Sequence, residues 1–167
     1  MKRTRNFTLI ELLVTLAIIL VLAGILVGGI RVATIKADEA KTRAVIEQLV
    51  HGLEKYRSER LRYPFGDGEI KFYRSSGKLR IVIDDKEYDF FSKQTGVDYC
   101  QFNFVTATSK ASANPLLDAW DEPIKYRGPG GHNKTAFDVW STGVSGPDDS
   151  DTSKDPSDDI TNWNNLL

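Results

Sequence analysis

Residues 5–31, RNFTLIELLVTLAIILVLAGILVGGIR, decide which architectures this chain can adopt. From Leu12 to Ile30 the stretch has 19 residues without a charge. As an α-helix it would be about 28 Å long, which is enough to cross a bilayer. Three basic residues among the first five precede it, and such flanks stay in the cytoplasm. We therefore expect one transmembrane helix, rather than the shorter apolar core of an ordinary secretory signal.

Glu11 places a carboxylate at the start of this apolar stretch, and a charged group at such a position requires an explanation. A charge at the centre of the hydrocarbon costs on the order of 2.5–3.5 kcal/mol and usually marks function. One explanation is that the carboxylate reaches the interface, favoured there by the helix dipole. The other is that proteolysis between Asn6 and Phe7 creates an α-ammonium on Phe7 that pairs with Glu11 of its own or a neighbouring chain.

The segment FTLIELLVTLAIILVLA resembles the class III signal of type IV pilins and type II secretion pseudopilins. The resemblance implies that a prepilin peptidase removes the leader, residues 1–6, and methylates the new N-terminal Phe7. Residues 7–30 would remain as both transmembrane anchor and filament core, with Glu11 setting the register between subunits. The family has glycine before the cut, whereas this chain has Asn6, a residue that also adopts turn and left-handed conformations.

The helix is expected to continue through residues 31–64 as an amphipathic helix. Apolar side chains recur there close to the i, i+3, i+4, i+7 spacing of one helix face. These positions are Ala44, Ile46, Leu49, Val50, Leu53 and Tyr56. Pro64 is the predicted end, because the residue before a proline is disfavoured in the α conformation.

Residues 65–167 change to a period of two, which indicates strands. Ile70 and Phe72 are followed by the turn-forming RSSGK and then by Leu79, Ile81 and Ile83, which predicts a hairpin. The segments EYDFF, YCQFNFV, PIKYRG and TAFDVWS are further candidate strands. A small antiparallel sheet packed on the apolar face of the helix would bury both surfaces, so the predicted fold class is α+β.

A second resemblance lies near the C-terminal end. The segments LLDAWDEPIKYRGPGG, FDVWSTG and DDITNW resemble the closing part of the major pseudopilins of type II secretion. The chain departs from that pattern at four positions. Ala119, Asp121 and Glu122 stand where the family has Pro, Gly and Asn, and Ser145 stands where it has an aspartate.

The acidic segment GPDDSDTSKDPSDDI, residues 146–160, holds six aspartates and one lysine. Oxygen ligands at this density suit Ca²⁺, which accepts six to eight of them in irregular geometry. The segment is not an EF-hand, because in a loop beginning at Asp149 the glycine position is Lys154 and the glutamate position is Ile160. An acidic, solvated tail is the alternative, although the apolar residues that follow favour a packed end.

The resemblance implies how such a Ca²⁺ site would be built. It assigns backbone carbonyls before the segment and aspartates within it as ligands. One further aspartate of the segment would replace the aspartate that the family has at the position of Ser145. The predicted ligands are the backbone of Thr142 and Val144 and the side chains of Asp149, Asp151, Asp158 and Asp159.

Composition excludes several classes of function. With 167 residues and a net charge of −1, the chain is one modest domain plus an anchor, and its scattered basic residues predict no nucleic-acid partner. Cys100 is the single cysteine and cannot form an internal disulfide. No phosphate loop, G-x-S-x-G or metal-ligand spacing of histidines and cysteines is present, so we expect no enzyme.

The prediction is therefore a structural subunit of a type II secretion pseudopilus. It would sit in the bacterial inner membrane as a single-pass protein with its C-terminal region in the periplasm, and then polymerise into a helical filament that drives protein export. The resemblance implies as partners a prepilin peptidase, an inner-membrane assembly platform and minor pseudopilins. The alternatives are a type IV pilus subunit, for adhesion, motility or DNA uptake, and a membrane-anchored Ca²⁺-binding module that does not polymerise.

Overall fold

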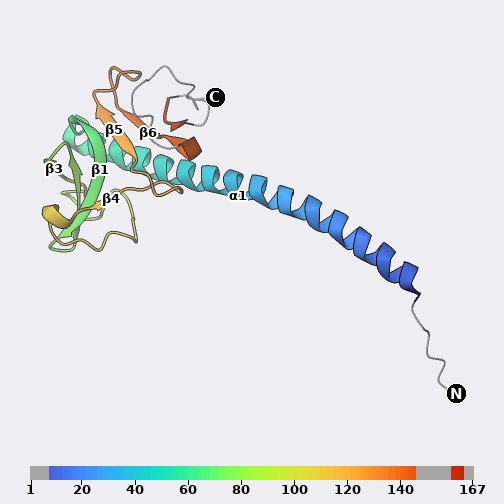
Figure 1. Cartoon of the computed structure of the whole chain (residues 1–167). Helices are drawn as coiled ribbons and strands as arrows, with labels where there is room; N and C mark the ends of the chain where they lie inside the picture. The colour runs from blue at the N-terminus through green and yellow to red at the C-terminus, as the bar shows by residue number, and fades with distance from the viewer. Residues whose placement is uncertain (1–7, 146–158, 164–167) are drawn as a thin grey trace. The chain divides into compact units, whose positions relative to one another are not determined.

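The computed structural model describes residues 8–145 and 159–163, without the side chains of residues 25–29 and 145. It divides into two units, Met1–Ala37 and Asp38–Leu167. The first helix, α1 (Leu9–Arg60), contributes to both units. The second unit is a helix packed on an antiparallel sheet, so the α+β prediction is confirmed (Figure 1).

Helix α1 has no proline, and its interior is rich in leucine, isoleucine and alanine, which favour or tolerate helical geometry. It ends at Arg60, four residues before the predicted end at Pro64. Leu61 adopts a left-handed backbone with φ of 60°, and its N–H donates to the carbonyl of Arg57 at 2.7 Å. A residue in this conformation closes a helix by satisfying one of its last carbonyls, so the proline is not what stops α1.

The sheet has the strand order β3-β2-β1-β5-β6-β7, and β4 also pairs with β1. All of its neighbouring strands are antiparallel. The strands are β1 (Gly66–Ser75), β2 (Lys78–Ile83), β3 (Lys86–Asp89), β4 (Asn114–Pro115), β5 (Lys125–Gly128), β6 (Asp138–Ser141) and β7 (Ile160–Thr161). Two short 3-10 helices, η1 (Lys110–Ser112) and η2 (Gly143–Ser145), complete the described elements.

The predicted hairpin is confirmed, with Ile70 opposite Ile83 and Phe72 opposite Ile81. Its turn residues Ser76 and Gly77 both have positive φ, as the type I′ turn of tight hairpins requires.

The other strand predictions have mixed outcomes. EYDFF contains β3, PIKYRG contains β5 and TAFDVWS contains β6. The prediction of a strand over YCQFNFV is wrong, because these residues form turns and irregular structure. Several of its side chains are nevertheless buried, so the apolar pattern there indicates core packing without strand pairing.

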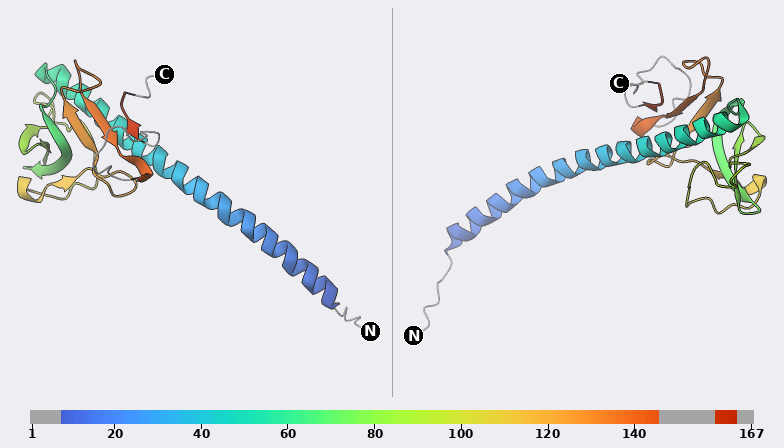
Figure 2. Two further views of the ribbon diagram at one scale, coloured as in Figure 1. Left: turned by 45° about the horizontal axis from the view of Figure 1, so that its top comes forward. Right: turned by 180° about the vertical axis from the view of Figure 1, so that it is seen from behind.

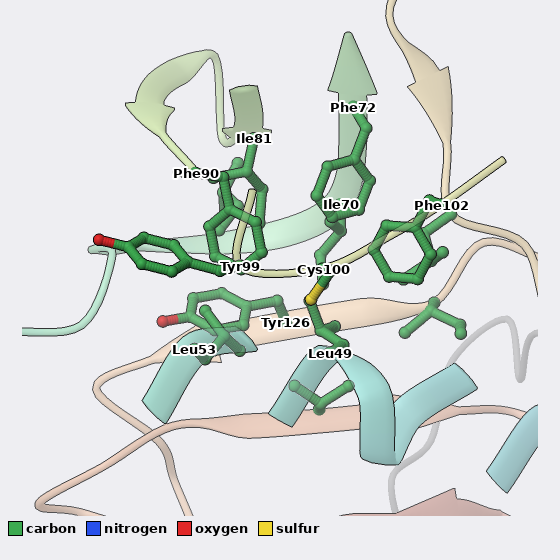
Figure 3. Packing of buried hydrophobic residues seen from close by; sticks show 14 of the residues in the cluster. Leu49, Leu53, Ile70, Phe72, Ile81, Phe90, Tyr99, Cys100, Phe102 and Tyr126 are labelled. Carbon is green, nitrogen blue, oxygen red and sulfur yellow. The ribbon is translucent and has the colours of Figure 1, made fainter. Parts of the chain in front are cut away.

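The core lies between α1 and the sheet. Leu49 and Leu53 of α1 meet Ile70 and Phe72 of β1, and Tyr126 of β5 lies among them (Figure 3). The irregular segment supplies Tyr99, Cys100 and Phe102 to the same cluster. Ala44, predicted on the buried face, is exposed, whereas the polar Thr42 is fully buried. In both views of Figure 2, β5 and β6 lie beside the C-terminal half of α1.

Candidate functional site

The start of α1 is closed by a reciprocal set of hydrogen bonds between Thr8 and Glu11. The Glu11 carboxylate accepts from the backbone N–H and from the hydroxyl of Thr8, both at 3.0 Å. In return, the N–H of Glu11 donates to the Thr8 hydroxyl at 3.3 Å. This arrangement is a capping box, in which the residue before the helix and the third helical residue satisfy each other's free N–H groups. The carboxylate is therefore hydrogen-bonded within its own chain.

The predicted cleavage residues Asn6 and Phe7 lie outside the described residues. The predicted transmembrane segment, residues 7–30, is also described only in part, because the side chains of residues 25–29 are left out. Among the residues that are described, no helix is both long enough and apolar enough to cross a membrane.

The first part of α1 carries a large apolar surface. Its exposed side chains have exposed fractions from 49% at Val14 to 84% at Leu9. Globular domains rarely leave contiguous apolar patches of this kind uncovered unless they are interaction sites. The residues are Leu9, Ile10, Leu12, Leu13, Val14, Leu16, Ile18, Ile19, Leu20, Val21, Leu22, Ile30 and Val32.

The last strand pair of the sheet joins β6, which precedes the acidic segment, to β7, which begins at its last residue. Ser141 of β6 pairs with Ile160 of β7. Because the strands are antiparallel, the next residues outward, Thr142 and Asp159, follow directly from this pair. The structure thus brings together two of the predicted Ca²⁺ ligands, one from before the acidic segment and one from its C-terminal end.

The other predicted ligands have different positions. Val144 lies in η2 with an exposed side chain. Asp149, Asp151 and Asp158 lie outside the described residues. Within residues 8–145 and 159–163, no group of three or more histidine, cysteine, aspartate or glutamate side chains could hold a metal ion. The donors described so far, two carbonyls and one carboxylate, are all oxygens and fit the preference of Ca²⁺.

The two residues that follow β7, Asn162 and Trp163, also contact the rest of the domain. Asn162 donates its N–H to the Val139 carbonyl at 3.1 Å, and its side-chain carbonyl accepts from the N–H of Val139 at 2.9 Å. Its side-chain amide donates to the Phe137 carbonyl at 3.0 Å. Next to it, the Trp163 ring stacks on His132, with centroids 4.3 Å apart and planes 8° from parallel.

Asp138, at the start of β6, organises the glycine-rich loop that carries His132. Its buried carboxylate accepts the N–H of His132 at 2.8 Å and of Asn133 at 3.0 Å. Burial raises the pKa of this carboxyl, but the hydrogen bonds from the backbone of His132, Asn133 and Gly131 more than offset that effect, so the pKa is lowered. A Cβ at Gly130 would lie 2.5 Å from the Asp138 carboxylate, so the loop needs glycine at this close approach.

Another buried carboxylate, that of Asp118, links the 118–122 turn to β6. Asp118 accepts the N–H groups of Trp120 and Glu122 at 2.9 and 3.0 Å, and the Ser141 hydroxyl at 2.5 Å. Sequence reasoning missed this group. The available signal was a polar residue within an apolar pattern, such as Asp118 directly after Leu117, which is not specific enough to name partners.

Comparison with known proteins gives two family matches, one at each end of the chain. Residues 1–27 match the prokaryotic N-terminal methylation motif. Residues 105–163 match the family described as type II secretion system (T2SS), protein G.

Curated relatives agree along nearly the whole length. The type II secretion system core protein G of Dickeya chrysanthemi is 29% identical over 163 residues, covering 98% of this chain and 88% of the relative. The proteins of the same description from Pectobacterium carotovorum subsp. carotovorum and Klebsiella pneumoniae are 25% and 24% identical, over 97% and 98% of this chain and 86% and 96% of theirs. The comparison with solved structures gave no significant match.

A helix with an apolar start, a packed antiparallel sheet and an N-terminal methylation motif define the pilin-like class of filament subunit. Both family matches and the curated relatives support a similarity to the major pseudopilins of type II secretion, within the type IV pilin-like family.

Proposed function

We propose that this pseudopilin polymerises through the first part of α1 into the pseudopilus of a type II secretion system and so drives protein export. The observation that carries the proposal is the exposed apolar surface between Leu9 and Val32, which begins with a satisfied carboxylate at Glu11. Such a surface is buried either by lipid or by neighbouring helices. Its role is structural, not catalytic.

Before assembly, the apolar part of α1 anchors the chain in the bacterial inner membrane. The basic residues before Asn6 stay in the cytoplasm, and the unit Asp38–Leu167 lies in the periplasm. A prepilin peptidase cleaves between Asn6 and Phe7 and methylates Phe7. The assembly platform in the inner membrane and the minor pseudopilins are the expected partners of the processed subunit.

Glu11 then changes partners. In the uncleaved chain its carboxylate is satisfied by Thr8. Cleavage creates an α-ammonium on Phe7, and in the filament core this cation pairs with Glu11 of a neighbouring subunit. Removing either member of a buried ion pair is strongly destabilising, because it leaves an uncompensated charge. This pairing sets the register between subunits.

The acidic segment is proposed to hold one Ca²⁺. The backbone carbonyls of Thr142 and Val144 and carboxylates from Asp149, Asp151, Asp158 and Asp159 would be its ligands. The ion would supply a cross-link between the end of β6 and the start of β7, because it draws oxygens from both sides of the segment. The adjacency of Thr142 and Asp159 beyond the Ser141–Ile160 pair supports this assignment.

The first experiment is peptide mass spectrometry on the protein isolated from its native membranes. A chain that begins at N-methylated Phe7 is expected. A chain that keeps residues 1–6 would overturn the processing proposal.

The second experiment separates charge pairing from helix capping. Glu11→Gln keeps the capping box, since glutamine serves at the same position, but removes the charge. We expect it to reduce filament yield at least tenfold. Thr8→Val, which keeps the carboxylate, is the matched control and should still assemble. Normal filaments from Glu11→Gln would contradict the pairing.

A further inference from the structure

An open pocket lies at the C-terminal end of α1, where the helix, the residues after it and the glycine-rich loop meet. Its volume is about 250 Å³, which is below the range of about 300–1,000 Å³ for pockets that bind small molecules. A pocket of this size suits a side chain of another protein. Its lining includes Arg57, Leu61, Arg62, Phe65, Pro129 and Ala136.

The lining of the pocket combines exposed apolar side chains with positive charge. Leu61 is 89% exposed and Phe65 is 63% exposed. The charged residues of the lining are two cations, Arg57 and Arg62. Arg57 donates to the Tyr63 hydroxyl at 3.1 Å, whereas Arg62 makes no hydrogen bond or ion pair within the described residues. The pocket is therefore complementary to a carboxylate that has an apolar neighbour.

Contacts beneath the pocket hold its walls in place. The Tyr126 hydroxyl donates to the Pro64 carbonyl at 2.6 Å, and a Cβ at Gly128 would lie 2.5 Å from the same carbonyl oxygen. On the other wall, the N–H of Gly130 donates to the Ala136 carbonyl at 3.3 Å. The pocket is thus already formed in the single chain, and a pre-formed surface loses less conformational entropy on binding.

A complementary acidic surface lies on the 118–122 turn, which connects β4 to β5. Asp121 is exposed in this turn and has a left-handed φ of 66°. Its side chain makes no hydrogen bond or ion pair with any other described residue. Glu122 follows it, and the exposed Leu117, which pairs with Pro123, lies at the base of the turn. The turn therefore presents carboxylates close to an apolar side chain.

The pocket and this turn are too far apart to meet within one chain. The turn is attached to α1 where the N–H of Ala119 donates to the Thr42 hydroxyl at 3.0 Å. The pocket begins at Arg57, 15 residues further along the helix, which is about 22 Å at 1.5 Å per residue. β5 runs from the turn towards the pocket, and its last residue, Gly128, lines it. A carboxylate that enters the pocket must therefore come from another molecule.

We propose that the pocket at Arg57 and Arg62 receives the Asp121 turn of the next copy of this chain in the filament. The inference rests on the proposed polymerisation and names a contact outside the apolar part of α1. A filament requires two different surfaces on each subunit, because a surface that pairs with itself closes a dimer. The pocket and the turn are such a pair, opposite in charge and at opposite ends of the same unit. Opposite charges select the partner more than they add affinity.

The first test exchanges the two charges in the full chain and measures filament yield. Arg62→Glu and Asp121→Lys each place like charges opposite each other, and we expect each to reduce the yield about tenfold or more. The double variant restores opposite charges, so its yield should recover to within about threefold of the wild type. Lys93→Glu is the matched control, because Lys93 is an exposed cation after β3 and outside the pocket. It should keep the wild-type yield.

The second test leaves Asp121 unchanged, because lysine is less suited than aspartate to its left-handed backbone. In filaments of the Arg62→Lys variant, a carbodiimide couples the new amine to a carboxylate in direct contact. Peptide mass spectrometry should find a cross-link between positions 62 and 121. The separation along α1 excludes this cross-link within one chain. Asp121→Asn in the same background removes the carboxylate and should abolish it.

Failure of this inference differs from failure of the polymerisation proposal. Wild-type filaments that tolerate both charge reversals, or a double variant that assembles no better than the single ones, would overturn the inference alone. So would Arg62→Lys filaments without the cross-link. A wild-type chain that forms no filaments would overturn the polymerisation proposal and this inference together.

Discussion

Thr8 and Glu11 satisfy each other at the first turn of α1, with two hydrogen bonds into the carboxylate and one back to the hydroxyl. None of these three bonds requires a second subunit. A carboxylate at the edge of an apolar helix is therefore stabilised within its own chain by the residue that caps the helix. In the proposed filament, Glu11 would gain the α-ammonium of Phe7 as a partner, in addition to Thr8 or in its place.

Thr8→Val should loosen the start of α1. Loss of an N-cap costs about 1 kcal/mol, which corresponds to about fivefold faster amide hydrogen exchange over the first turn. Exchange of the full chain in micelles, followed by mass spectrometry, measures this. Thr15→Val is the control, because the Thr15 hydroxyl donates to the Leu12 carbonyl within the helix and caps nothing. Equal effects of the two substitutions would argue against a capping role.

Leu61→Gly should stabilise the fold by about 1 kcal/mol. Leu61 has a left-handed φ of 60°, which costs a residue with a Cβ about 1–2 kcal/mol and costs glycine little. Its side chain is 89% exposed, so little packing is lost. Leu61→Ala is the control that trims the side chain without relieving the backbone, and it should leave the urea midpoint nearly unchanged. A glycine variant no more stable than the alanine variant would refute the explanation.

Gly52→Ala should destabilise the fold although alanine is the better helix former. A Cβ at Gly52 would lie 2.1 Å from the sulfur of Cys100, which packs against this face of α1. Overpacking of about 1–3 kcal/mol outweighs a helix-propensity gain of about 1 kcal/mol. Cys100→Ala removes the clashing atom, so the double variant should be more stable than the sum of the single effects predicts. Strict additivity in denaturant unfolding would contradict the contact.

Asp138→Asn should make the free energy of unfolding depend less on pH in the acid range. In the unfolded chain the carboxyl has its ordinary pKa of 3.8, and in the folded chain the backbone N–H groups of the glycine-rich loop lower that pKa. The resulting stabilisation is complete above the unfolded pKa and disappears as the pH falls through the folded one. The variant should be less stable than the wild type at pH 7. The difference between their free energies of unfolding should decrease below about pH 4.

Denaturant unfolding across that pH range measures the difference. Asp67→Asn is the comparison, because Asp67 pairs with Arg127 on the exposed surface. Exposed ion pairs contribute about 0–1 kcal/mol, so this variant should follow the wild type. A constant gap between the Asp138→Asn variant and the wild type at all pH values would contradict the assigned role.

Local patterns were sufficient for much of the fold. The helical period before Tyr56, the alternation on both sides of the RSSGK turn and the two strands flanking the glycine-rich loop all predicted elements that the structure contains. Each depends on residues only a few positions apart, whose conformations neighbouring side chains and turn residues largely decide.

The failures share a physical cause. YCQFNFV has the composition of a strand, but Phe102 and Val105 belong to the buried core cluster while their segment is not paired in the sheet. The end of α1 depends on the backbone of Leu61, not on Pro64. Asp121 has a left-handed φ of 66°, which explains why the resemblance places glycine there, yet only the folded turn reveals that conformation.

The sequence alone predicted the apolar stretch, the acid at Glu11, the α+β class and the similarity to pseudopilins, because these depend on local composition and spacing. Only the tertiary structure decided the strand order and the bringing together of Thr142 with Asp159. It alone paired the N–H of Ala119 with the Thr42 hydroxyl and the Ser141 hydroxyl with Asp118. Those partners lie far apart along the chain, and a pairing between distant polar groups is selected by the geometry of the packed core, which no local pattern encodes.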